Sequence, residues 1–460
     1  MTLLLNKKAH SMKLHYLFSL GLLFLSAESL AITKQSDSLQ VKTPAAVARK
    51  FVEALSVGAY ENACAQFDGS VRGAISVQKL NEIWTALNAQ SGAFKRIQSV
   101  WSESATPYTI EYVVTEFANA VLDLKIVLSD SATIVGFFIL PHQEEHAYMP
   151  PAYVMPGSYR ETDVWVGSGQ WRLPGTLTLP NGSGPIPAVV LVHGSGPNDR
   201  DETIGPNKPF KDLALGLASQ RIAVLRYEKR TKVYASKMLR SKDSITVKEE
   251  TIDDALAAVT LLQHTPGIDA RKIFVLGHSL GGMLVPRIGL ADSSIAGFVV
   301  MAGASRPLED LILEQMKYIA SLDDTITGEM KKQLEKLSQQ VLRVKDKSLS
   351  LQTDPAELPP GVPPKYWLDL RGYAPAQSAA RLNRPMLILQ GERDYQVTME
   401  DYREWKAFLS GKKNVQFKTY PKLNHLFVAG NGKSTPAEYQ AAGQVADDVV
   451  NDIARWISCQ

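Results

Sequence analysis

Residues 273–284 carry the sequence Ile-Phe-Val-Leu-Gly-His-Ser-Leu-Gly-Gly-Met-Leu. The first four residues form the short apolar run of a buried strand, and a glycine-rich helix start follows the last part of the motif. Between them, Gly277 to Gly281 has the pattern G-x-S-x-G, in which a serine occupies a strained turn between strand and helix. Glycines two residues before and after the serine remove the Cβ atoms that would collide there. The segment therefore predicts that Ser279 is a nucleophile.

This segment lies in a long region, residues 160–460, in which apolar strands alternate with helices. Near-continuous apolar runs of this kind are typical of a parallel sheet with both faces covered. The expected strands are 188–192, 222–225, 273–276, 295–300, 386–389 and 415–420. The expected helices include 210–219, 247–264 and a C-terminal helix 438–457, and residues 165–179 predict an antiparallel hairpin at the entry. The pattern predicts an α/β fold with a mostly parallel sheet covered by helices.

The partners of a nucleophilic serine on such a sheet should follow in the order acid, then histidine. Asp394 lies in the loop after the strand 386–389, and His425 lies in the loop after the strand 415–420. Open α/β sheets place their sites at these carboxyl ends of the strands. A serine hydroxyl needs an imidazole to remove its proton, and a buried carboxylate orients that imidazole. Ser279, Asp394 and His425 are therefore the predicted catalytic triad.

Two other carboxylates, Glu392 and Asp401, compete for the role of the acid. Asp394 is preferred because it occupies the position that the Gly-x-x-Asp pattern gives to the triad acid.

Acyl transfer also needs donors for the oxyanion. The amide of Leu280, directly after the serine, is the first candidate. The second is the amide of Ser195 in the loop His193-Gly194-Ser195-Gly196-Pro197, with Gly196 as the alternative. A phosphate-binding role for this glycine-rich loop is disfavoured, because no Gly-Lys-Ser/Thr follows it.

At these residues the chain resembles the α/β-hydrolases, and within them the secreted bacterial esterase and serine-aminopeptidase-like group. The shared motifs are His-Gly-Ser-Gly-Pro at 193–197, Asp-Arg-Asp-Glu at 199–202, Asn-Lys-Pro-Phe at 207–210 and Arg-Tyr-Glu-Lys-Arg at 226–230. The resemblance covers residues 160–460. It implies the same triad and oxyanion donors, and an esterase that needs no cofactor or metal and acts on a small-molecule ester.

An insertion at about 304–380 interrupts the alternation of strands and helices. Segments added between the sixth and seventh strands commonly form a helical cap that shapes the substrate site, and a surface elaboration is the alternative. A second hypothesis for the function is an aminopeptidase or peptidase that cleaves amide bonds with the same triad. A free substrate amine would need a carboxylate cluster, for which Glu309, Asp310 and Glu314 are candidates.

The N-terminal 31 residues have the features of a signal peptide. Lys7, Lys8 and Lys13 precede an apolar run at 17–25, and Ser29-Leu30-Ala31 forms a small-x-small cleavage site. The run is too short to span a bilayer. We therefore expect a protein that is exported to the periplasm or secreted, with no membrane span after cleavage.

Residues 32–140 predict a separate α+β domain, because helical patterns come first and alternating strands follow. Their order resembles that of the small nuclear-transport-factor/SnoaL-like domains. Residues 141–159 are the expected linker. A third hypothesis is that this domain binds a ligand or partner, with hydrolysis secondary.

The composition excludes several other classes of protein. A chain of 460 residues is too long for one ordinary core. A formal net charge of +3 lacks the basic bias of a nucleic-acid-binding protein. With only Cys64 and Cys459 there is no disulfide framework, although one bridge is possible. No Cys/His cluster has the spacing of a zinc site, and we assign His142 and His146 to a solvated loop.

Overall fold

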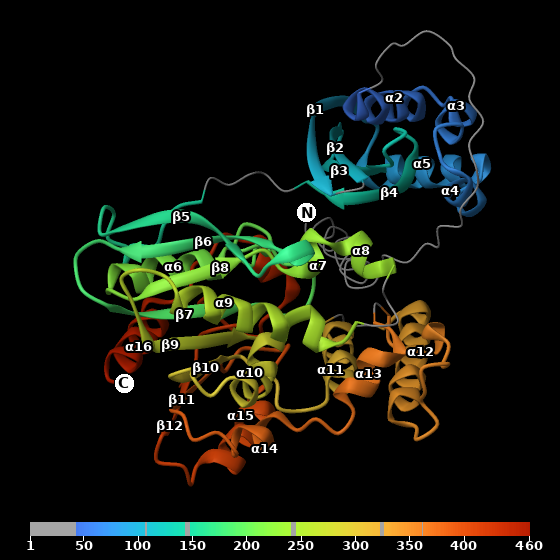
Figure 1. Ribbon diagram of the computed structural model, residues 1–460. Coiled ribbons are helices and arrows are strands. Elements are labelled where there is room, and N and C mark those ends of the chain that lie inside the picture. Colours follow the sequence, from blue (N-terminus) through green and yellow to red (C-terminus); the bar gives the residue numbers. More distant parts are fainter. Residues whose placement is uncertain (1–42, 106–107, 143–147, 241–244, 323–325, 361) are drawn as a thin grey trace. The chain divides into compact units, whose positions relative to one another are not determined.

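The computed structural model describes residues 43–460 except 106–107, 143–147, 241–244, 323–325 and 361. The predicted signal peptide and His146 therefore lie outside the described residues. The chain divides into two compact units, Met1–Glu145 and His146–Gln460 (Figure 1). Each unit has its own hydrophobic core.

The N-terminal unit consists of helices followed by an antiparallel sheet, as the α+β pattern predicts. Its helices are α2 (Pro44–Ser56), α3 (Tyr60–Cys64), α4 (Gly69–Ala74) and α5 (Val77–Ser91). Its strands pair in chain order: β1 (Phe94–Ala105), β2 (Tyr108–Phe117), β3 (Val121–Leu128) and β4 (Ile134–Pro141). Helix α2 starts where the Thr43 hydroxyl accepts a hydrogen bond from the amide of Ala46, and its Phe51 side chain is fully buried. Cys64 and Cys459 are free thiols.

The C-terminal unit is built on an eight-stranded sheet with the order β12-β11-β10-β9-β7-β8-β6-β5. Its strands are β5 (Tyr159–Val166), β6 (Leu173–Pro180), β7 (Ile186–Val192), β8 (Ala223–Tyr227), β9 (Ile268–His278), β10 (Gly297–Met301), β11 (Met386–Gly391) and β12 (Val415–Tyr420). All pairs from β8 to β12 are parallel, whereas β6 is antiparallel to both of its neighbours. The predicted mostly parallel sheet and its antiparallel entry hairpin are confirmed.

Helices cover both faces of this sheet, which Figure 1 shows. Helices α9 (Asp253–Gln263), α10 (Leu280–Ala291) and α15 (Met399–Leu409) pack on one face. Helices α6 (Pro209–Ser219) and α16 (Asp447–Ser458) pack on the other. Alternate residues of β7 belong to the hydrophobic cores on opposite faces of the sheet. Val190 lies in the core formed with α9 and α10, and Val189 and Leu191 lie in the core formed with α6. Such apolar residues on both faces explain why these strands lack a polar alternation.

The C-terminal helix is shorter than the predicted 438–457. A 3₁₀ turn, Pro436–Gln440, precedes α16, and the segment between them is not helical. There, Asn207 accepts a hydrogen bond from the Gly443 amide, and Asp212 accepts one from the Val445 amide. These side chains take backbone groups that a continuous helix would use, so tertiary contacts override the helical pattern.

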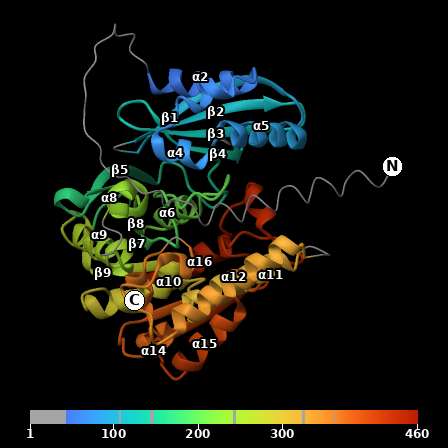
Figure 2. The same cartoon turned by 90° about the vertical axis from the view of Figure 1, so that its right-hand side faces the viewer.

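The insertion contains α11 (Leu308–Ala320), α12 (Gly328–Lys345), α13 (Pro364–Leu370) and α14 (Pro375–Ala379). Helices α11 and α12 pack side by side, as Figure 2 shows. In contrast, Tyr366 and Leu370 of α13 and Ala376 of α14 belong to the main core. The last part of the predicted insertion is therefore integral to the sheet domain, and the prediction of a cap stays with α11 and α12.

Candidate active site

Ser279 lies at a strained turn between β9 and α10. Its φ of 53° and ψ of −116° fall outside the regions that ordinary residues favour. A Cβ atom on Gly277 would lie 2.3 Å from the Gly281 carbonyl oxygen, and one on Gly281 would lie 2.2 Å from that of Val192. Both glycines are therefore required by the close approach of backbone, as the motif predicts.

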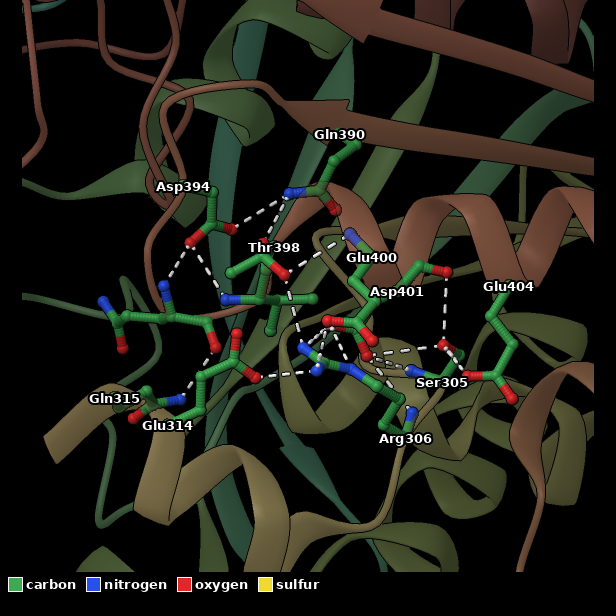
Figure 3. Close-up of polar contacts among 12 residues, drawn as sticks. Ser305, Arg306, Glu314, Gln315, Gln390, Asp394, Thr398, Glu400, Asp401 and Glu404 are labelled. Atoms are coloured by element: carbon green, nitrogen blue, oxygen red, sulfur yellow. Dashed lines mark hydrogen bonds and ion pairs between the residues drawn. The ribbon is translucent and has the colours of Figure 1, made fainter. Parts of the chain in front are cut away.

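His425 and Asp394 form a buried pair at the ends of β12 and β11. The Nδ1 atom of His425 lies 2.7 Å from Oδ2 of Asp394. The other carboxylate oxygen of Asp394 accepts hydrogen bonds from the amides of Gln396 (2.8 Å) and Val397 (3.0 Å). Gln390 also donates to Asp394, and Figure 3 shows this contact. Since Nδ1 of His425 is engaged, Nε2 is the ring nitrogen left for proton transfer.

The two competing carboxylates have other partners. Glu392 accepts a hydrogen bond from the Thr419 hydroxyl at 2.8 Å. Asp401 is fully buried and lies 2.7 Å from Arg306, a cluster that Figure 3 shows beside Asp394. Of the three candidate acids, Asp394 is the one that the structure brings against His425.

The loop after β7 lies directly against Ser279, because β7 and β9 are neighbours with Val192 opposite Gly277. A Cβ atom on Gly194 would lie 3.0 Å from that of Ser279. Leu280 is the first residue of α10, where helical amides have no carbonyl partner within the helix. Ser195 is exposed at the next position of the loop. Both predicted oxyanion donors therefore belong to segments that contact or contain Ser279.

Comparison with known proteins agrees with this architecture. The family described as "Serine aminopeptidase, S33" matches residues 188–430, which is more than half of the chain. The chain is also 40% identical over 407 residues to Esterase EstD of Thermotoga maritima, covering 88% of this chain and 93% of that protein. The chain belongs to this α/β-hydrolase family. A second family, described as a protein of unknown function (DUF3887), matches residues 48–137.

Solved structures with a similar chain include Est1E from Butyrivibrio proteoclasticus, with a TM-score of 0.41, 15% identity and coverage of 65% of this chain and 99% of that one. An esterase from Pyrococcus furiosus has a TM-score of 0.40 and 17% identity, covering 69% of this chain and 97% of its own.

In this α/β-hydrolase, His278, the residue before Ser279, pairs with the buried carboxylate of Glu202. No sequence pattern predicts this pair. Nδ1 of His278 lies 2.8 Å from Oε2 of Glu202, and Nε2 of His278 donates to the His425 carbonyl at 2.9 Å. Burial alone would lower the pKa of His278, but the Glu202 carboxylate outweighs it and raises that pKa. Conversely, burial would raise the pKa of Glu202, and His278 holds it below its usual range. Both ring nitrogens of His278 lie within 2.9 Å of oxygen atoms, an arrangement that favours the protonated form of the imidazole.

A second missed group is Lys229, whose side chain is fully buried. Its amine lies 2.6 Å from Glu250 and donates to the Gly194 carbonyl at 2.7 Å. Glu202 and Lys229 belong to the motifs 199–202 and 226–230, which the resemblance singled out without assigning these residues a role.

The structure also explains the charges between these motifs. Arg200 binds Glu228 at 2.8 Å, and Asp201 forms an ion pair with Arg226. The Asp-Arg-Asp-Glu segment is therefore tied to the end of β8 beside the loop that contains Ser195. This is a structural role for residues that the triad does not use.

The carboxylates proposed to bind a substrate amine are largely paired in this α/β-hydrolase. Asp310 lies 2.5 Å from Lys345, and Glu314 lies 2.7 Å from Arg306. Burial raises the pKa of the third, Glu309. Two of the three groups are thus already neutralised by cations of the chain.

Within the described residues, no group of three or more His, Cys, Asp or Glu side chains could hold a metal ion. The same part of the chain contains no helix long and apolar enough to cross a membrane.

Proposed function

We propose that this α/β-hydrolase cleaves carboxylic esters through an acyl-enzyme formed on Ser279. The observation that carries the proposal is the buried His425–Asp394 pair, with 2.7 Å between Nδ1 and Oδ2. The carbonyl of His425 binds His278, the residue directly before the strained Ser279. The relationship to a protein named Esterase EstD supports esters as the substrate class.

In the proposed reaction, the Ser279 hydroxyl attacks the acyl carbon while Nε2 of His425 takes its proton. The amides of Leu280 and Ser195 stabilise the oxyanion of the tetrahedral intermediate. His425 then donates the proton to the departing alcohol, which leaves the acyl group on Ser279. Water attacks this ester with His425 again as the base, and the carboxylic acid is released with the serine regenerated.

The test is the Ser279→Ala variant, assayed with a chromogenic short-chain ester and with a fluorophosphonate probe. We expect loss of both turnover and labelling. Ser410→Ala is a suitable control, because Ser410 is exposed at the end of α15, and it should keep both. Labelling of Ser279→Ala at the wild-type rate would exclude this serine as the nucleophile.

Amide hydrolysis with the same triad is the second candidate, favoured by the description of the matching family as a serine aminopeptidase. The pairing of Asp310 and Glu314 with cations argues against capture of a free amine in the insertion. Turnover of an acyl ester should therefore exceed that of an aminoacyl anilide. A panel of esters with graded acyl length would then define the substrate class.

We also propose that the protein is exported, on the basis of the basic segment, apolar run and cleavage site in residues 1–31. Cell fractionation with N-terminal sequencing of the product tests this. The expected product begins at residue 32 and lies outside the cytoplasm, and an uncleaved cytoplasmic chain would contradict the proposal.

A further inference from the structure

We propose that Lys229 is a positioning residue that orients the amide of Ser195 toward the oxyanion. The inference rests on the proposed function, because it concerns the oxyanion donor of that reaction. It assigns a role to a buried cation that the triad does not use.

The first support is the environment of Lys229. Its side chain is only 2% exposed, so a role through another group is favoured over contact with a substrate. Nζ donates to the Gly194 carbonyl at 2.7 Å and pairs with Glu250 at 2.6 Å. A buried ammonium needs such partners, because an unpaired charge inside a protein is strongly destabilising. The Gly194 carbonyl is therefore held by a charge-assisted hydrogen bond.

The second support is the geometry of the peptide bond between Gly194 and Ser195. In a planar trans peptide, the carbonyl of one residue and the amide N–H of the next point in opposite directions. A Gly194 carbonyl held on the buried amine of Lys229 therefore turns the Ser195 N–H away from Lys229. Gly194 itself packs on Ser279, with 3.0 Å between a Cβ built on it and that of the serine. The fixed peptide thus presents its N–H next to the nucleophile.

The third support is that the Gly194 amide is already used. It donates to Oε1 of Glu202 at 2.6 Å, and Oε2 of Glu202 faces His278. Gly194 is therefore held at its N–H by Glu202 and at its carbonyl by Lys229, and the Asn198 side chain also donates to that carbonyl at 3.2 Å. The Gly194 amide is therefore not free to bind the oxyanion, and Ser195 carries the next amide of the loop.

The contacts that hold Lys229 in place continue through Glu250 to α13, the helix that follows α12. Oε2 of Glu250 accepts a hydrogen bond from the Tyr366 hydroxyl at 2.7 Å, and Tyr366 belongs to α13 in the main core. Tyr366, Glu250 and Lys229 form a buried chain of contacts that ends at the Gly194 carbonyl. The position of the Lys229 amine is thereby determined by the core and not by the exposed loop.

The test compares the wild type with Lys229→Met, which keeps the length of the side chain and removes the donor. The kcat for ester hydrolysis is expressed per active site titrated with a fluorophosphonate. We expect kcat per site to fall by about 10²-fold, as for loss of one oxyanion donor, with KM within twofold of wild type. The affinity for a trifluoromethyl ketone, whose adduct carries an oxyanion, should fall by the same factor.

Removal of Lys229 leaves Glu250 without its cation, so the double variant Lys229→Met/Glu250→Gln is measured in parallel. The double variant should show the same loss of kcat per site, and because both charges of the buried pair are removed, no unpaired charge remains in the core. Lys412→Met is the control, because the Lys412 amine likewise donates to backbone carbonyls, those of Ala380 and Leu382, but at the opposite ends of the strands. Its kcat per site should equal that of wild type.

Two results overturn the inference. The first is a wild-type kcat per titrated site in either Lys229 variant, which would mean that the lysine only supports folding. The second is a loss that appears in KM with unchanged affinity for the ketone. Failure of the proposed function is a different outcome, since it would appear as turnover and labelling in Ser279→Ala whatever the Lys229 variants show.

Discussion

The imidazole of His278 and the carboxylate of Glu202 form an ion pair in the interior, with 2.8 Å between Nδ1 and Oε2. His278 immediately precedes Ser279 in the chain, and Glu202 binds the amide of Gly194. One buried pair therefore joins the serine turn to the neighbouring loop. Its charges depend on pH, which makes its contribution to stability measurable.

The pH dependence follows from the two pKa shifts. The pKa of His278 is raised from an ordinary value of about 6.5, so its contribution is complete below that pH and is lost as pH rises through the folded-state pKa. The pKa of Glu202 is lowered from about 4.3, so its contribution is complete above that pH and is lost as pH falls through the folded-state pKa. The pair should stabilise the fold most between about pH 4.3 and 6.5.

We therefore expect Glu202→Gln to lower the free energy of unfolding by about 3–5 kcal/mol at pH 5.5, because it leaves a buried imidazole without its counter-ion. The difference from wild type should narrow as pH rises and His278 loses its proton. Urea unfolding of both proteins between pH 5 and 9 measures this. A difference that is constant over this range would show that the pair is not ionised.

The role of Asp394 is tested by Asp394→Asn, which keeps the size of the side chain. We expect kcat for ester hydrolysis to fall by about 10³–10⁴-fold, because the amide cannot stabilise the imidazolium of His425. Glu392→Gln is the control, since Glu392 contacts Thr419 and not His425, and it should change kcat less than twofold. A comparable loss of kcat in both variants would contradict the assignment of Asp394, and not Glu392, as the triad acid.

The close backbone approach at the serine turn predicts a large effect of one methyl group. In Gly281→Ala, the added Cβ would lie 2.2 Å from the Val192 carbonyl oxygen. We expect a loss of about 3 kcal/mol or more in unfolding free energy. Gly328→Ala adds the same methyl group in open space at the start of α12, and should leave stability unchanged or raise it by up to about 1 kcal/mol. Thermal and urea unfolding of the two variants provide the comparison.

Arg306 connects the start of the insertion to the start of α15. It binds Asp401, which has no exposed surface, and Glu314 of α11 (Figure 3). Arg306→Gln should therefore destabilise the fold by about 3–5 kcal/mol, because it leaves a buried carboxylate unpaired. Hydrogen exchange should increase first in α11 and in the first turn of α15. Arg343→Gln, which breaks the more exposed pair with Glu357, should cost less than about 1 kcal/mol.

The two units should fold independently, because each buries its own core. A chain of residues 146–460 should unfold cooperatively and keep the ester turnover per site of the full protein. Circular dichroism during heating and an ester assay measure both. Folding with an altered substrate range would instead support a ligand-binding role for the N-terminal unit.

The sequence predicts the sheet and the polar residues at its carboxyl end because both leave local patterns. Apolar runs locate the strands, and G-x-S-x-G fixes the position of Ser279. Glu202 and Lys229 leave no such pattern, because a charged residue in a loop is usually solvated and only the tertiary structure shows its burial. The prediction of a C-terminal helix over 438–457 is wrong for a similar reason. Asn207 and Asp212, more than 200 residues away in the sequence, bind the amides of Gly443 and Val445, where the helical pattern continues.

The hydrogen bond from His278 to the His425 carbonyl also limits how this fold can vary. In the sheet, β12 lies three strand spacings from β9, which corresponds to about 14 Å. The segment after β12 must cross that span to bring His425 to the serine, and His278 anchors it there. His278, the residue before the serine in the G-x-S-x-G motif, thus fixes the loop after β12 at the carboxyl end of β9. Deleting a single residue from 421–424 should therefore break the contact between His278 and the His425 carbonyl and displace the His425 imidazole together with it.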